Sequence, residues 1–120
     1  MKKKILIVED NKPDVDLLEA ILANEEVTTY VAKDGNEAIN MYIQEDYDMI
    51  LLDLRMPIIS GLDVLKYIRA ADRVTPVYMI TATATKDVEK ECMNAGATEY
   101  ITKPFKPSYI KEVVQRWSLK

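Results

Sequence analysis

The 120-residue sequence contains no histidine and only one cysteine, Cys92. Without histidine, the chain cannot build the Ser-His or Cys-His pairs that serve in nucleophilic catalysis. One cysteine excludes an internal disulfide and a metal site built on several thiolates. Cys92 stands in a helical pattern, which predicts a small buried hydrophobe.

Long apolar runs are also missing. No run approaches the about 20 residues that a helix needs to cross a bilayer. The basic start Met1-Lys2-Lys3-Lys4 is followed by only four apolar residues and then by acids, unlike a signal peptide. We therefore expect a cytoplasmic protein without membrane insertion.

Composition bounds the class of protein. An apolar fraction of 48% and a charged fraction of 30% are typical of a globular chain, and the length predicts a single domain over residues 1–120. The net charge is −4 and the pI about 4.9. Such a chain repels polyanions, so we expect no direct binding to nucleic acid.

The pattern alternates between β-rich apolar runs and helical stretches of about ten residues, which predicts βαβ units and a parallel sheet. The expected strands are residues 5–8, 27–32, 48–53, 77–80 and 99–102. The third is apolar at almost every position, as in a strand covered on both faces. We predict a doubly wound, flavodoxin-like α/β fold of five parallel strands in the order 2-1-3-4-5.

Local signals place the helices. A first helix is expected over residues 13–24, and Asp34 with Glu37 has the pattern of a capping box that opens the second. The apolar face of the second helix is predicted to be Ala38, Ile39, Tyr42 and Ile43. The later helices are expected to begin near Ser60, Thr85 and Pro107, and Gly96 suits the left-handed residue that ends a helix.

Residues suited to phosphate chemistry stand at four strand ends: Glu9 and Asp10, Asp53, Thr81, and Lys103. Carboxyl ends of parallel strands share one edge, where open α/β sheets bind ligands, and the order 2-1-3-4-5 brings the three acids together. Charges about 5 Å apart repel by roughly 3 kcal/mol per pair at an effective dielectric near 20. Protonating one acid, or binding a hard cation such as Mg²⁺, relieves that repulsion.

An aspartate can form an aspartyl phosphate if the incoming phosphoryl group is well placed. Phosphoryl transfer requires that the phosphoryl group is positioned and that the negative charge on its three equatorial oxygens is neutralised. Mg²⁺, the Lys103 ammonium and the Thr81 hydroxyl would supply this. Each residue alone has an ordinary explanation as a cap or turn residue. Their joint occurrence at successive strand ends is what favours a phosphoryl-transfer site.

The sequence resembles the receiver domains of two-component response regulators. The resemblance covers essentially the whole chain and is carried by Glu9-Asp10, Asp53, Met56-Pro57, Gly61, Thr81-Ala82 and Lys103-Pro104-Phe105. It implies that Asp53 is the phosphoacceptor. It also implies a Mg²⁺ site formed by Glu9, Asp10, Asp53 and the backbone carbonyl of Arg55. Glu9 replaces the commoner aspartate, which should alter how the metal is held.

The same resemblance implies roles for the residues around the acids. Lys103 would bind the phosphoryl group, and its peptide to Pro104 is expected to be cis. Thr81 would move toward a phosphoryl oxygen as Tyr100 changes rotamer. Structural turn positions would be Pro57, Gly61 and Pro104, and the positions that tune the phosphoryl lifetime would be Arg55 and Thr83.

The function implied is that of a signalling domain that catalyses only its own phosphorylation and dephosphorylation. The phosphoryl donor would be a sensor histidine kinase or a phosphotransfer protein. The face made by the fourth helix, the fifth strand and the fifth helix would bind the downstream effector. That face is also a candidate for a phosphorylation-dependent dimer.

Three other classes are distinguishable. A haloacid-dehalogenase-type phosphatase needs a second aspartate two residues after the first, where Arg55 stands. A flavin or dinucleotide binder would carry a glycine-rich loop after the first strand, where Asn11-Lys12-Pro13 stands. A pseudo-receiver would act as a phosphorylation-independent binding module. A metal titration would distinguish it from a receiver domain that accepts a phosphoryl group.

Overall fold

The computed structural model describes residues 2–23 and 25–118, in which strands and helices alternate. The strands are β1 (Lys3–Val8), β2 (Val27–Ala32), β3 (Met49–Leu52), β4 (Val77–Thr81) and β5 (Glu99–Thr102). The helices are α1 (Lys12–Leu22), α2 (Gly35–Gln44), α3 (Gly61–Ala71), α4 (Lys86–Asn94) and α5 (Pro107–Ser118). The predicted end of the first helix, Asn24, lies outside the described residues.

All neighbouring strands of the sheet are parallel, in the order β2-β1-β3-β4-β5. The predicted topology is therefore confirmed. Val8 at the end of β1 pairs with Leu52 at the end of β3. Because these two strands end level with each other, the residues that follow, Glu9 and Asp53, leave the sheet side by side.

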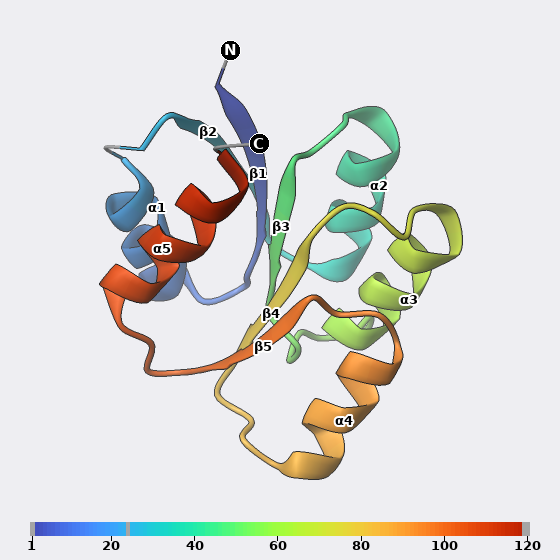
Figure 1. Cartoon of the computed structure of the whole chain (residues 1–120). Helices are drawn as coiled ribbons and strands as arrows, with labels where there is room; N and C mark the ends of the chain where they lie inside the picture. Colours follow the sequence, from blue (N-terminus) through green and yellow to red (C-terminus); the bar gives the residue numbers. More distant parts are fainter. Residues whose placement is uncertain (1, 24, 119–120) are drawn as a thin grey trace.

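Helices cover both faces of the sheet (Figure 1). On one face α1 and α5 bury an apolar cluster that includes Leu18, Ile21, Leu22, Ile110, Val113 and Val114. On the other, α2, α3 and α4 bury a cluster that includes Ala38, Val64, Leu65, Ile68 and Cys92. All four residues of β3 are buried, as its apolar pattern predicted. The buried position of Cys92 is likewise confirmed.

The helix starts predicted at Asp34, Ser60 and Thr85 have capping hydrogen bonds. The Asp34 carboxylate accepts the Glu37 amide at 2.8 Å. The Glu37 carboxylate accepts the Lys33 amide at 2.9 Å, one residue before the position that a capping box uses. Ser60 and Thr85 cap α3 and α4 with their hydroxyl groups. The bonds accepted by Asp34, Ser60 and Thr85 satisfy amides that the first turn of a helix leaves without partners.

The predicted core face of α2 was wrong at one position, because Ile43 is 62% exposed. Gly35 and Ala38 are the buried residues of this helix, and Tyr42 and Ile39 are half-buried. Successive helical residues are rotated by about 100°, so Ile43 points well away from the stripe formed by Gly35, Ala38 and Tyr42. The prediction had placed Ile43 on the apolar face because it follows Ile39 by four residues.

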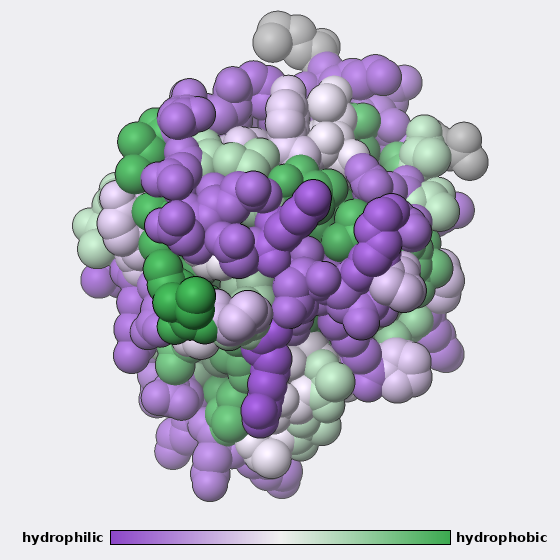
Figure 2. Space-filling view, turned by 180° about the vertical axis from the view of Figure 1, so that it is seen from behind, coloured by the Kyte–Doolittle hydropathy of each residue, from purple (hydrophilic) through white to green (hydrophobic). Residues whose placement is uncertain are grey.

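Figure 2 shows the face opposite to that of Figure 1, which is mostly hydrophilic with small groups of hydrophobic side chains. Within the described part of the chain, the large hydrophobic side chains that stay exposed are Leu17, Ile43, Ile58, Tyr67, Val74 and Met93. Among the helices in residues 2–23 and 25–118, none combines the length and apolar character that a membrane crossing requires.

Among the residues that the structure describes, Gly96 and Ile58 have positive φ. Gly96 has a φ of 109° after α4, which confirms the predicted left-handed position. Ile58, in the loop between β3 and α3, has a φ of 68° and is fully exposed. A β-branched residue in this region is strained because its side chain crowds the backbone.

Ile58→Asn is expected to raise the free energy of unfolding by about 1 kcal/mol, because asparagine tolerates the left-handed region. Ile58 buries no surface that the substitution would lose. Urea unfolding followed by circular dichroism would measure the change. Ile58→Val keeps the β-branch and should leave stability unchanged. An equal response of both variants would show that the loop backbone is not strained.

Candidate functional site

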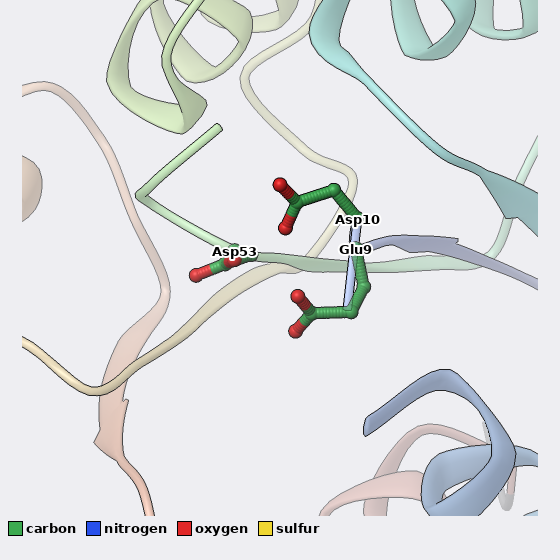
Figure 3. A group of neighbouring side chains, drawn as sticks. All are labelled: Glu9, Asp10 and Asp53. Carbon is green, nitrogen blue, oxygen red and sulfur yellow. The ribbon is translucent and has the colours of Figure 1, made fainter. Parts of the chain in front are cut away.

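Three carboxylates meet at the ends of β1 and β3. Each of Glu9, Asp10 and Asp53 offers an oxygen, and these oxygens lie within 4.8 Å of one another. Figure 3 shows all three carboxylates directed into one shared space. Glu9 and Asp53 are buried, with 2% and 6% of their surface exposed, whereas Asp10 is exposed. The predicted convergence of the acids is confirmed.

The backbone around these acids continues the hydrogen bonding of the sheet. The Glu9 amide donates to the Ala32 carbonyl at 3.0 Å, and the Asp53 amide donates to the Val8 carbonyl at 2.9 Å. The Asn11 amide in turn donates to Oε2 of Glu9 at 3.2 Å. The two buried acids are therefore held by the sheet itself, so their proximity does not depend on loop conformation.

Gly61 allows α3 to start close to Asp53. Its amide donates to the Leu54 carbonyl at 2.8 Å. A Cβ atom at this position would lie 2.0 Å from the Asp53 carbonyl oxygen, well inside van der Waals contact. Only glycine fits this approach of helix and loop, which agrees with the structural role expected for it.

Lys103, the residue after β5, reaches the acids across the cleft. Its Nζ lies 2.7 Å from Oε1 of Glu9 and 2.7 Å from Oδ2 of Asp14. Burial lowers the pKa of Lys103, but the hydrogen bonds to Asp14 and Glu9, together with the charges of Asp53 and Glu9, outweigh this and leave the pKa raised. The amine therefore stays charged at neutral pH. The predicted cis peptide between Lys103 and Pro104 is confirmed.

Sequence reasoning missed Asp14 as part of the site. Asp14 stands in the first turn of α1, where Asn11 caps the helix by accepting the Asp14 amide at 3.1 Å. An acid in a first turn is ordinarily explained by the helix dipole. The available signal was that this helix starts directly after the acidic end of β1, so its first turn faces the same edge.

The environment of Asp53 disfavours its charged form. Burial raises the pKa of Asp53 to about 7, and hydrogen bonding with Glu9 and repulsion by its charge contribute in the same direction. Lys103 and the Arg55 amide, which donates to Oδ1 of Asp53 at 3.3 Å, act in the opposite direction. Without a cation, the cluster therefore favours a protonated Asp53.

Thr81 ends β4 beside the acids and is fully buried. Its Oγ1 accepts the Thr83 amide at 3.2 Å. The Nε of Arg55 donates to Oγ1 of Thr83 at 2.9 Å, and the Tyr100 hydroxyl donates to the Thr83 carbonyl at 2.6 Å. The sequence placed these residues near the site. It did not predict that three of them bond to Thr83.

The cleft above the acids has a volume of about 370 Å³. Its lining consists of Glu9, Asp10, Asn11, Asp14, Asp53, Arg55, Thr81, Ala82, Thr83 and Lys103. A larger groove of about 550 Å³ adjoins it between the β3–α3 loop and α4, and Asp10 and Arg55 line both. The predicted acids, hydroxyl and amine thus share one cleft.

Comparison with known proteins gives a consistent result. Residues 5–115 match the family described as the response regulator receiver domain. The cell cycle transcriptional regulator CtrA of Caulobacter vibrioides is 34% identical over 102 residues, which cover 85% of this chain and 44% of CtrA. The chain therefore spans less than half the length of this curated relative.

Solved structures agree with this family match. The chemotaxis protein CheY4 of Vibrio cholerae is 27% identical with a TM-score of 0.89, over 98% of this chain and 99% of that one. The receiver domain of the sensor histidine kinase PA1611 of Pseudomonas aeruginosa is 32% identical with a TM-score of 0.89, over 100% of both chains. That structure has a magnesium ion coordinated in its active site cleft.

The chain belongs to the response regulator receiver domain family. Members are signalling domains, and phosphorylation and Mg²⁺ binding are general in the family. They interact with histidine kinases, phosphotransfer proteins and effector domains. The acidic group formed by Glu9, Asp10 and Asp53 is able to hold such a metal ion.

Asp53→Asn should stabilise the metal-free protein at pH 8 and have little effect at pH 4. The unfolded carboxyl releases its proton near 3.8 and the folded one near 7, so stability falls as pH rises through this window. At about 1.4 kcal/mol per pKa unit, reduced by local relaxation, we expect a gain of about 1–3 kcal/mol.

Urea unfolding at both pH values in EDTA would measure this gain. Asp46→Asn, at an exposed position after α2, is the matched control and should show no such pH dependence. A gain of equal size at pH 4 and pH 8 would contradict a raised pKa at Asp53.

Proposed function

We propose that this domain accepts a phosphoryl group on Asp53 from a histidine kinase or a phosphotransfer protein. The observation that carries the proposal is the placement of a buried Asp53 within 4.8 Å of two other carboxylates, in a cleft that also contains Lys103 and Thr81. In the transfer, the donor's phosphorus–nitrogen bond breaks as a bond forms from an Asp53 oxygen to phosphorus. The donor nitrogen keeps the electron pair and takes up a proton.

The donor set fits Mg²⁺. Three carboxylates provide hard oxygen ligands, and Mg²⁺ is commonly held by one or two carboxylates together with water. Glu9, Asp10, Asp53 and the backbone carbonyl of Arg55 would hold the ion. When bound, Mg²⁺ would neutralise the acids and part of the phosphoryl charge. The raised pKa of Asp53 supports this, because burial and the neighbouring Glu9 both disfavour its charged form.

The other oxygens of the phosphoryl group would interact with protein groups. Lys103 already forms ion pairs with Glu9 and Asp14 in the cleft, so its ammonium is in place to contact one oxygen. The Thr81 hydroxyl would donate to another oxygen. Arg55 and Thr83, at the rim of the cleft, would set how readily water reaches the phosphoryl group. Pro57 and Pro104 would shape the loops around it.

Phosphorylation would then shift a two-state equilibrium. It adds nearly two negative charges and strong acceptor oxygens, which interact differently with Thr81 and Lys103 in the two states. Coupling of about 1–3 kcal/mol is typical of such switches. The change at Thr81 and Tyr100 would alter the face formed by α4, β5 and α5, which would bind an effector or a second copy of the domain. We propose a cytoplasmic location for this exchange.

Acetyl phosphate with Mg²⁺ should add one phosphoryl group to the wild type, and Asp53→Asn should abolish the labelling. Intact-mass spectrometry at neutral pH would measure the labelled fraction. Asp46→Asn is the control and should be labelled like the wild type. Equal labelling of Asp53→Asn would remove Asp53 from its proposed role.

Mg²⁺ should raise the melting temperature of the wild type and much less that of Asp10→Asn. A ligand at about 100 times its Kd stabilises a protein by about 2.7 kcal/mol, provided that the unfolded chain does not bind it. Thermal unfolding in MgCl₂, compared with NaCl at equal ionic strength, would measure the effect. A wild type that does not respond would favour the alternative of a phosphorylation-independent binding module.

A further inference from the structure

Thr83, in the loop between β4 and α4, makes hydrogen bonds with residues of three separate segments. Its amide donates to Oγ1 of Thr81 at 3.2 Å, and its own Oγ1 accepts from Nε of Arg55 at 2.9 Å. Its carbonyl accepts from the Tyr100 hydroxyl at 2.6 Å. Arg55 lies in the loop after β3, and Tyr100 lies in β5. One loop residue therefore links the acceptor loop, the end of β4 and β5.

We propose that Arg55 is a positioning residue that acts through Thr83 to hold Tyr100 on the β4–α4 loop before any phosphorylation. For its place in signalling, this inference rests on the proposed function. Arg55 contacts the acceptor by its main chain, since its amide donates to Oδ1 of Asp53 at 3.3 Å. It contacts Thr83 by its side chain. A change at the Asp53 carboxylate is thereby linked to the loop that Tyr100 binds.

The hydrogen bonds of Thr83 are compatible with a phosphorylated Asp53. A threonine hydroxyl has one proton and two lone pairs. At Thr81, one lone pair accepts the Thr83 amide, so the hydroxyl proton stays available for an acceptor in the cleft. Phosphorylation would therefore add a bond at Thr81 without breaking the bond to Thr83.

Tyr100 is suited to donate this hydrogen bond in the unphosphorylated protein. It is half-buried, and burial raises the pKa of its phenol, so the hydroxyl keeps its proton at neutral pH. Its oxygen lies 2.6 Å from the Thr83 carbonyl. The position of that carbonyl depends on the loop, which the bond between Arg55 and Thr83 restrains. Loss of the bond should free the loop and release Tyr100.

The test uses the unphosphorylated protein and two substitutions that remove this bond. Thr83→Val removes the hydroxyl and keeps the shape of the side chain, and Arg55→Met removes the donors. Thr83→Ser keeps a hydroxyl and serves as the rescue variant. One readout is amide hydrogen exchange at position 83. The second is the NMR signal of fluorotyrosine at position 100, assigned with Tyr100→Phe.

Each of Thr83→Val and Arg55→Met should speed exchange at position 83 by about five-fold, the factor for one typical hydrogen bond. Both should move the fluorotyrosine signal in the same direction, and Thr83→Ser should stay close to the wild type. The double variant should show no further change, because both substitutions remove the same interaction. Melting temperatures would confirm that each variant is folded.

Unchanged exchange at position 83 and an unmoved Tyr100 signal in folded Arg55→Met would overturn the proposal, since Arg55 would then be merely solvated. Additive effects in the double variant would overturn it as well. Failure of acetyl phosphate to label the wild type would instead count against the proposed function. The exchange and fluorine measurements need no phosphoryl group, so the two failures are distinguishable.

Discussion

The contact of the Lys103 ammonium with Glu9 and Asp14 is the interaction on which the rest of the cleft depends. The sheet forces Glu9 and Asp53 to leave neighbouring strands side by side, and their repulsion in a partly buried cleft is large. A single amine at 2.7 Å from two carboxylates offsets part of that repulsion. Burial and the remaining repulsion by Glu9 raise the pKa of Asp53, so that a bound cation would favour its charged form.

The packing of the sheet explains why this electrostatic conflict persists. Apolar clusters on both faces bury the strands, and β3 is buried along its whole length. A shift of β1 against β3 that separated the acids would break parallel pairing and expose these clusters to water. The acids are thus held together by hydrophobic burial elsewhere. The cleft is ready to bind a cation because the packed sheet prevents the acids from moving apart.

Relatives show that the same domain serves different outputs. CtrA is a transcriptional regulator, CheY4 a chemotaxis protein, and the PA1611 domain belongs to a sensor histidine kinase. Fold alone therefore does not indicate what such a domain controls. In this chain, the features that could distinguish its behaviour lie at the rim of the cleft, where Arg55 bonds to Thr83 and Thr83 accepts from Tyr100.

The strand and helix pattern, the strand order and the convergence of Glu9, Asp10 and Asp53 followed from the sequence, because hydrophobic periodicity reports burial and strand ends share an edge. Only the tertiary structure showed that Lys103 binds Asp14 and that Thr83 joins three segments. Local patterns specify which face of an element is buried. They do not specify which distant polar side chain meets which, because that depends on how the loops are placed once the core has packed.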